Sequence, residues 1–167
     1  MESWIQSENS QFNLPAVIKS SSPEETIDLG KKLASYLSKG NIVALKGALG
    51  AGKTCLVKGI AMGLGIKDEI TSPTYTIISE YEIINQAEFP VKNELIPVYH
   101  IDAYRLQGND DFSLLGGEEV IFGNGISVIE WSDNISGMIP PDAIKIDIKI
   151  LDGDNRLITI NGVKAGK

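Results

Sequence analysis

The chain has 167 residues, 43% of them hydrophobic and 22% charged, a composition typical of one globular domain with a sizeable core. Its net charge of −7 and pI near 4.7 argue against a broad surface for nucleic acid or an anionic membrane, because both require a basic face. One cysteine excludes an intrachain disulfide, and no apolar run approaches the roughly 20 residues that span a bilayer, so we expect a cytoplasmic protein without a membrane partner.

The first elements predicted are a loose polar extension, a short strand over 16–19 and a helix. Ser22 is an N-cap residue, a proline follows at the first helical position, and Glu25 completes a capping box. An apolar stripe then runs to Lys39-Gly40, where we expect the helix to end.

A phosphate-binding P-loop follows at 47–54, where GALGAGKT fits G-x-x-x-x-G-K-[ST]. The apolar run 42–45 predicts a buried strand before it, and the helical spacing over 54–64 predicts a helix that Gly65 ends. Glycines let such a loop wrap a pyrophosphate with its N–H groups, while Lys53 brings positive charge to the β- and γ-phosphates and Thr54 supplies a hydroxyl for Mg²⁺. The residues expected to bind ATP here are Gly47, Leu49, Gly50, Ala51, Gly52, Lys53, Thr54 and Cys55. We interpret Cys55 as a small core residue rather than a reactive thiol.

The hydroxyl-rich segment 71–76 has two interpretations that the sequence leaves open. Thr71, Ser72 and Thr74 surround a proline, which suits a turn stabilised by side-chain bonds to the backbone. The same segment suits a switch-like loop that senses the γ-phosphate. A strand over 76–84 and a polar hairpin loop over 85–94 are predicted next.

Two further apolar strands each end in an acid. The run 96–102 ends in Asp102, and the run 126–129 is followed by Glu130, with a helix predicted between them over 110–122. In an open α/β sheet, sites gather at the carboxyl ends of the strands, where the P-loop also lies. We therefore expect Asp102 and Glu130 to converge with Lys53 and Thr54, the constellation for Mg²⁺-assisted phosphoanhydride hydrolysis.

Other polar residues near these strands carry less information. His100, the one histidine, has no cysteine or histidine partner, so we expect a hydrogen-bonded strand-end residue rather than a metal ligand. Arg105 suits either a surface ion pair or a charge that orders the Asp102 region or the phosphates. The alternating pattern over 144–150, a turn at 152–155 and the run 156–160 predict a C-terminal antiparallel hairpin.

Four segments together resemble the TsaE (YjeE) family of bacterial ATPases of tRNA threonylcarbamoyladenosine (t⁶A) biosynthesis: GALGAGKT, SPTYT at 72–76, HIDAYRL at 100–106 and IEW at 129–131. The resemblance covers about Ser22 to Ile160 and implies an α/β fold, a single P-loop NTPase domain with a mixed, mostly parallel sheet flanked by helices. It implies slow ATP hydrolysis with Mg²⁺, action with TsaB and TsaD to reset the threonylcarbamoyl-transferase complex, and contact with tRNA only through that complex.

By the same resemblance, Thr54 and Glu130 are Mg²⁺ ligands, and Asp102 is an essential acid near the metal or the attacking water. Supporting or switch-like roles fall to Thr74, Tyr104, Arg105 and Trp131. One departure is Ala48, where family P-loops often carry an aspartate. We divide the chain into an extension with the first strand over 1–21, the ATPase domain over 22–162 and a tail over 163–167.

The adenine pocket and the reaction class stay less defined. Segment 22–26, with Ser22, is a candidate pocket wall, and Arg156 is a further candidate for contact with ATP. A small-molecule kinase usually needs a basic lid, yet the chain has only two arginines; a GTPase is disfavoured because no N-K-x-D segment is present; a non-catalytic nucleotide-gated scaffold stays open.

Overall fold

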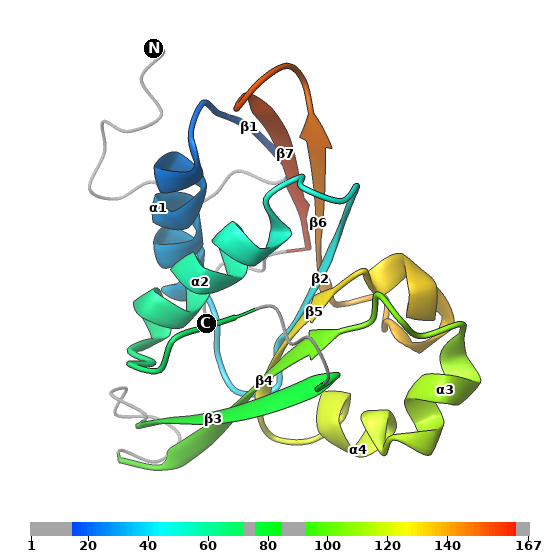
Figure 1. Ribbon diagram of the computed structural model, residues 1–167. Helices are drawn as coiled ribbons and strands as arrows, with labels where there is room; N and C mark the ends of the chain where they lie inside the picture. Colours follow the sequence, from blue (N-terminus) through cyan, green and yellow to red (C-terminus); the bar gives the residue numbers. More distant parts are fainter. Residues whose placement is uncertain (1–14, 72–75, 85–92, 163–167) are drawn as a thin grey trace.

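A computed structural model of the chain describes residues 15–71, 76–84 and 93–162 (Figure 1). Its strands are β1 (Ala16–Ser20), β2 (Ile42–Gly47), β3 (Ile78–Ile84), β4 (Leu95–Asp102), β5 (Ile126–Glu130), β6 (Ile144–Ile150) and β7 (Arg156–Asn161). They form one sheet in the order β1-β7-β6-β2-β5-β4-β3. The four central strands are parallel, while β3, β7 and β1 pair antiparallel with their neighbours. The mixed sheet with a parallel core and a C-terminal hairpin of β6 and β7 confirms the predicted fold class.

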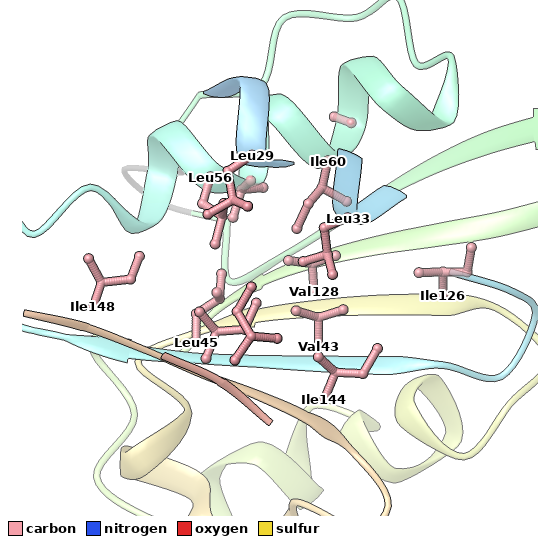
Figure 2. Packing of buried hydrophobic residues seen from close by; sticks show 14 of the residues in the cluster. Leu29, Leu33, Val43, Leu45, Leu56, Ile60, Ile126, Val128, Ile144 and Ile148 are labelled. Carbon is pink, nitrogen blue, oxygen red and sulfur yellow. The ribbon is translucent and has the colours of Figure 1, made fainter. Parts of the chain in front are cut away.

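Helices cover both faces of this sheet. They are α1 (Pro23–Ala34), α2 (Lys53–Leu64), α3 (Asn109–Leu114), α4 (Gly117–Ile121) and the 3-10 segment η1 (Ser132–Met138). Helices α1 and α2 lie together on one face, and α3 and α4 lie on the other (Figure 1). Figure 2 shows leucine and isoleucine side chains of α1 and α2 meeting valine, leucine and isoleucine side chains of β2, β5 and β6. Each helix thus buries one apolar stripe against the sheet, which is the main source of its stability.

Helix α1 begins as predicted but ends earlier. The Ser22 hydroxyl accepts a hydrogen bond from the Glu25 amide at 3.1 Å, and the Glu25 carboxylate accepts one from the Ser21 amide at 2.7 Å. The expected end at Lys39-Gly40 was wrong, because α1 stops at Ala34. After Ala34 each backbone amide donates to the carbonyl oxygen three residues earlier instead of four. The Ser35 hydroxyl also donates to the Lys32 carbonyl oxygen, so the α-helical pattern ends here.

The helix predicted over 110–122 is in fact two short helices. Helix α3 ends at Leu114 and α4 begins at Gly117, with Gly116 between them at φ 74°, a left-handed conformation that breaks an α-helix. Gly117 then lies against the Phe112 ring, where a Cβ atom would come within 2.4 Å of the ring. Smaller differences from the predicted ranges concern three elements. Helix α2 starts at Lys53 rather than at 54, β2 extends to Gly47 rather than to 45, and β3 starts at 78 rather than at 76.

Helices α1 and α2, which lie on one face of the sheet, approach each other very closely. An added Cβ at Gly59 of α2 would come within 2.0 Å of the Ile27 carbonyl oxygen of α1. Glycine at this position lets the backbones of α1 and α2 pack in direct contact. No helix in the described part of the chain is long and apolar enough to cross a membrane.

The sheet topology brings three chain segments together at the carboxyl ends of the parallel strands. Strands β2, β5 and β4 are adjacent and parallel, so their carboxyl ends lie side by side. Gly47 opens the P-loop at the end of β2, and Glu130 and Asp102 end β5 and β4 in register with each other. The predicted meeting of P-loop and strand-end acids is therefore a consequence of strand order.

Candidate nucleotide and metal site

The P-loop joins β2 to α2 through two glycines in left-handed conformations. Gly50 has φ 76° and Gly52 has φ 104°, values that side chains rarely adopt, and the Ala51 amide closes a turn on the Ala48 carbonyl at 3.0 Å. Gly52 is the N-cap of α2 and has no side chain to occupy the first amides of the helix. Those amides and the positive end of the helix dipole suit a phosphate group.

Lys53 is folded back onto this loop. Its Nζ donates to the carbonyl oxygens of Gly47 at 2.6 Å and Ala48 at 2.9 Å, and the residue is only 5% exposed. Burial lowers the pKa of Lys53 from its ordinary value of 10.5, and the negative charge of nearby carboxylates, Glu130 foremost, acts in the opposite direction. The ammonium group is therefore bound by two neutral carbonyl oxygens of the loop, and a bound phosphate would replace them as its partner.

An aromatic residue completes the surroundings of Lys53. The Nζ atom lies 3.8 Å from the centre of the Trp131 ring, a cation–π contact. Trp131 follows β5 directly and has φ 56° and ψ 41°, a left-handed conformation that is strained for a bulky side chain. Its ring also packs against that of Tyr104 in a tilted arrangement, with ring centres 4.8 Å apart and an angle of 49° between the ring planes. The strained turn after Glu130 thus directs the indole over the P-loop lysine.

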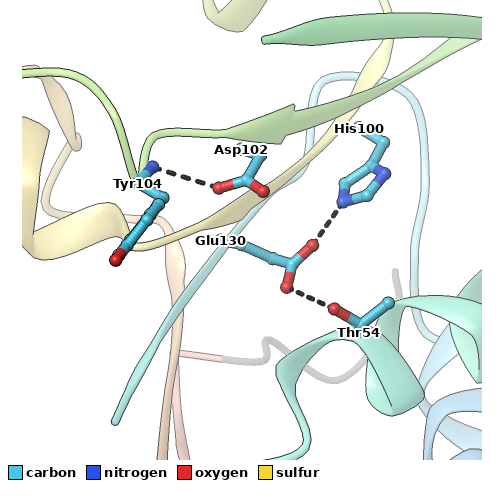
Figure 3. A network of polar contacts seen from close by, with 5 residues as sticks. All are labelled: Thr54, His100, Asp102, Tyr104 and Glu130. Atoms are coloured by element: carbon cyan, nitrogen blue, oxygen red, sulfur yellow. Dashed lines mark hydrogen bonds and ion pairs between the residues drawn. The ribbon is translucent and has the colours of Figure 1, made fainter. Parts of the chain in front are cut away.

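Glu130 forms the polar centre of the site, between α2 and β4 (Figure 3). Its Oε1 atom accepts a hydrogen bond from the Thr54 hydroxyl at 2.9 Å, and its Oε2 atom lies 2.6 Å from Nε2 of His100. Glu130 is 2% exposed, which is unusual for a carboxylate and requires such partners. Residues 54 and 130 are distant in sequence and meet through the strand order.

Asp102 lies beside Glu130 on the neighbouring strand. The two residues are paired in the β4–β5 register, and the Asp102 Oδ1 atom accepts the Tyr104 amide at 3.0 Å (Figure 3). The Asp102 amide in turn donates to the Ile77 carbonyl at 2.8 Å, which ties the segment before β3 to this edge of the sheet. Asp102 thus faces the same edge as the P-loop and is half-buried.

The oxygen donors around Thr54 suit Mg²⁺. A hydroxyl and a carboxylate oxygen already lie 2.9 Å apart, and Mg²⁺ prefers hard oxygen ligands supplied partly by phosphates and water. Among the described residues there is no group of three or more His, Cys, Asp or Glu side chains that would hold a metal alone. The donor set fits a metal that arrives with a nucleotide.

Comparisons with known proteins agree with this geometry. The family model described as threonylcarbamoyl adenosine biosynthesis protein TsaE matches residues 20–158. The chain belongs to the TsaE family. It is 39% identical over 141 residues to a Treponema pallidum protein named tRNA threonylcarbamoyladenosine biosynthesis protein TsaE, covering 84% of this chain and 96% of that protein. A Bacillus subtilis protein of the same name is 38% identical over 141 residues, covering 84% and 82%.

A solved structure gives the same fold for this TsaE-family chain. The crystal structure of Bacillus subtilis YdiB superposes with a TM-score of 0.67 at 35% identity, covering 89% of this chain and 86% of that one. The similarity extends over nearly the whole sheet and its helices, so the chain has a P-loop nucleotide-binding fold.

Other predicted site residues of the TsaE-family chain lie around the loop. The Arg156 side chain donates to the carbonyl oxygens of Ala51 at 3.0 Å and Gly50 at 3.1 Å, so it braces the P-loop from β7. Leu49 is 76% exposed at the tip of the loop. Cys55 is half-buried and is not among the fully buried residues, so it lies less deep than the core position that we predicted.

Segment 22–26 lies next to the P-loop, as expected. The methyl group of Thr26 is 4.0 Å from the position of a Cβ at Gly52, and Ser22 caps the same first turn of α1. Arg105 is exposed. Thr74 and most of the switch-like segment lie outside the described residues.

Sequence reasoning missed the contact of His100 with Glu130. It expected a hydrogen-bonded strand-end histidine, which the structure confirms, but named no partner. The signal was available in the spacing: His100 and Asp102 are two residues apart on β4 and therefore share a face of the sheet with the neighbouring Glu130.

A cavity of about 500 Å³ lies on the face of the sheet opposite α1 and α2. It is lined by Lys46, Asp147, Ser132 and neighbouring residues of β6, β7 and η1. None of the loop amides, Lys53 or Glu130 contributes to it. We therefore place the nucleotide at the P-loop, where phosphate-binding groups converge, and not in this cavity.

Proposed function

We propose that this chain binds ATP with Mg²⁺ and hydrolyses it in the pathway that forms tRNA N6-threonylcarbamoyladenosine at adenosine 37. The observation that carries the proposal is the meeting of Lys53, Thr54 and Glu130 at the carboxyl ends of β2 and β5. Family membership adds the biological context, since the relatives are named for tRNA threonylcarbamoyladenosine biosynthesis.

Each residue has a role in this proposal. The amides of 47–55 and the Lys53 ammonium hold the phosphates, and Thr54 with Glu130 holds Mg²⁺, which when bound neutralises charge on the β- and γ-phosphate oxygens. Asp102, beside Glu130, orients the attacking water. The Trp131 ring holds the Lys53 ammonium group in place until that group binds a phosphate.

The remaining predicted residues have supporting roles. Arg156 keeps the P-loop in shape through its carbonyls, and Ser22 anchors the first turn of α1 beside the adenine side of the site. Tyr104 and Arg105 support the edge next to Asp102, and Thr74 senses the γ-phosphate.

The proposal extends to partners. We assign TsaB and TsaD as the subunits that this chain resets after each threonylcarbamoyl transfer, in the cytoplasm, with tRNA held by those subunits. The net charge of −7 supports indirect contact with tRNA, because an acidic chain gains little from phosphate contacts.

Two experiments test the proposal. Phosphate release from ATP is measured for the chain alone and with TsaB and TsaD, and we expect the partners to increase it and to form an ATP-dependent complex on gel filtration. A kinase would instead move ³²P to an acceptor without free phosphate, and a scaffold would form the complex without turnover.

The second experiment is made in cells. Depletion of this protein should lower t⁶A in total tRNA, and the wild-type chain should restore it while a Lys53→Ala variant should not. Normal t⁶A after depletion, or full rescue by Lys53→Ala, would overturn the proposed function.

A further inference from the structure

The buried pair of His100 and Glu130 has a feature that a packing role leaves unexplained. The two side chains are each 3% exposed, and the Nε2 and Oε2 atoms are 2.6 Å apart. The other ring nitrogen, Nδ1, is buried and has no hydrogen-bond partner in the part of the chain that the structure describes. Most buried polar atoms in proteins are paired, so among the described residues the bond from Nε2 to Glu130 stands out as the polar contact of this ring.

The direction of the hydrogen bond follows from the partners. A carboxylate only accepts, so Nε2 carries the proton and donates it to Oε2. Within the ranges that the structure describes, the polar contact of the ring is therefore made through one nitrogen to one atom of Glu130. His100 is on β4 while Glu130 is on β5, so the bond links the carboxylate to the neighbouring strand of the sheet.

The bond divides the two oxygen atoms of Glu130 between different tasks. With Oε2 held by His100, Oε1 faces the Thr54 hydroxyl at 2.9 Å (Figure 3). Rotation of the carboxylate would break the bond to His100, and the two side chains are each only 3% exposed to water that could replace it. The geometry thus presents one chosen oxygen to the position next to Thr54.

We propose that His100 is a positioning residue that holds the Glu130 carboxylate so that Oε1 is presented to the Mg²⁺ of bound Mg·ATP. The inference rests on the proposed function, in which Glu130 is a metal ligand. It adds a residue that touches neither nucleotide nor metal. Groups that orient metal ligands in this way typically change metal affinity or activity by about 10- to 100-fold when they are replaced.

Two amide variants separate positioning from general damage. Glutamine in His100→Gln places its amide nitrogen near the position of Nε2 and can donate to Glu130, whereas asparagine in His100→Asn reaches only the position of Nδ1. Both substituted side chains are neutral and polar amides, so the comparison between the two variants controls for the loss of the imidazole ring itself. ATP affinity is measured by calorimetry with excess Mg²⁺ and again in EDTA, and the ratio reports how strongly the metal couples to the nucleotide.

We expect His100→Asn to lose about 10- to 100-fold in that ratio with unchanged affinity in EDTA, and His100→Gln to stay close to the wild type. Equal loss in both variants, no loss in His100→Asn, or an equal fall in EDTA would overturn the positioning role. If the ATP affinity of the wild-type chain is the same with Mg²⁺ and in EDTA, the assignment of Glu130 as a metal ligand is overturned, and this inference with it.

A measurement on the wild type does not depend on whether the variants fold. The chain has one histidine, so ¹⁵N NMR of its imidazole reports this ring alone. We expect the proton on Nε2, protected from solvent exchange and shifted when Mg·ADP is added but less by ADP in EDTA. A ring protonated on Nδ1 alone, or a spectrum that responds equally to both additions, would contradict the proposal.

Discussion

Replacement of Glu130 by alanine should separate nucleotide binding from hydrolysis. The change removes the acceptor of two hydrogen bonds, from the Thr54 hydroxyl and from the His100 ring. It leaves the loop amides and Lys53, which make the phosphate contacts, in place. In EDTA we therefore expect ATP affinity to be unchanged or slightly higher, because a negative charge near the phosphates is gone.

The effect on turnover should be much larger. Loss of one group that stabilises developing charge typically lowers kcat by about 10²-fold or more, which corresponds to roughly 2.7 kcal/mol of transition-state stabilisation. The folded state should also lose stability. A buried N–H left without an acceptor at His100 costs about 1–3 kcal/mol, so the free energy of unfolding should fall by that order.

The assay is phosphate release at saturating Mg·ATP, with TsaB and TsaD present, at a temperature where the urea unfolding curve shows the variant to be folded. Asp142→Ala is the control, since this exposed carboxylate precedes β6 at the opposite end of the parallel strands. We expect the control to match the wild type. A Glu130→Ala variant that is folded and hydrolyses ATP at close to the wild-type rate would falsify the assignment of Glu130 as a metal ligand.

Four further predictions concern the loop, its brace, the helix pair and the metal. Lys53→Ala should weaken ATP binding by about 1.5–3 kcal/mol, or tens-fold, because a charge-assisted contact is lost; unchanged affinity in calorimetry would exclude the P-loop as the site. Arg156→Ala should lower both ATP affinity and melting temperature, and Arg156→Lys should not restore them, since the bonds to the Ala51 and Gly50 carbonyls need the guanidinium fork; rescue by lysine would show that charge alone acts. Gly59→Ala should lower the free energy of unfolding by about 1–3 kcal/mol or more, because its Cβ would meet the Ile27 carbonyl oxygen; an unchanged urea midpoint would contradict the close contact of α1 and α2. EDTA should abolish phosphate release while ATP still binds; turnover that persists in EDTA would count against a metal-dependent reaction.

The features that the sequence alone determined are local ones. The P-loop could be recognised because glycine conformations, the lysine and the hydroxyl act within eight consecutive residues. The start of α1 followed from Ser22 and Glu25, and the C-terminal hairpin followed from strict alternation over 144–150, which only a strand with one buried face explains.

Strand-end acids were predicted correctly because they rest on a general rule about sheets. An apolar run that ends in an acid places that acid at the carboxyl edge, and the observed register pairs Asp102 with Glu130 as neighbours. Their assignment as catalytic or metal-binding groups stays a prediction until the variants are measured.

The tertiary structure alone decided the contacts between distant segments. The end of α1 at Ala34 and the break at Gly116 depend on backbone bonds and packing that an apolar stripe does not encode. The brace from Arg156 to Ala51 joins residues 105 positions apart, and the contact of Lys53 with Trp131 requires a strained left-handed turn. Such contacts arise when β5 and β6 insert on either side of β2, and the order of strands is set by the burial of two whole sheet faces rather than by any short segment.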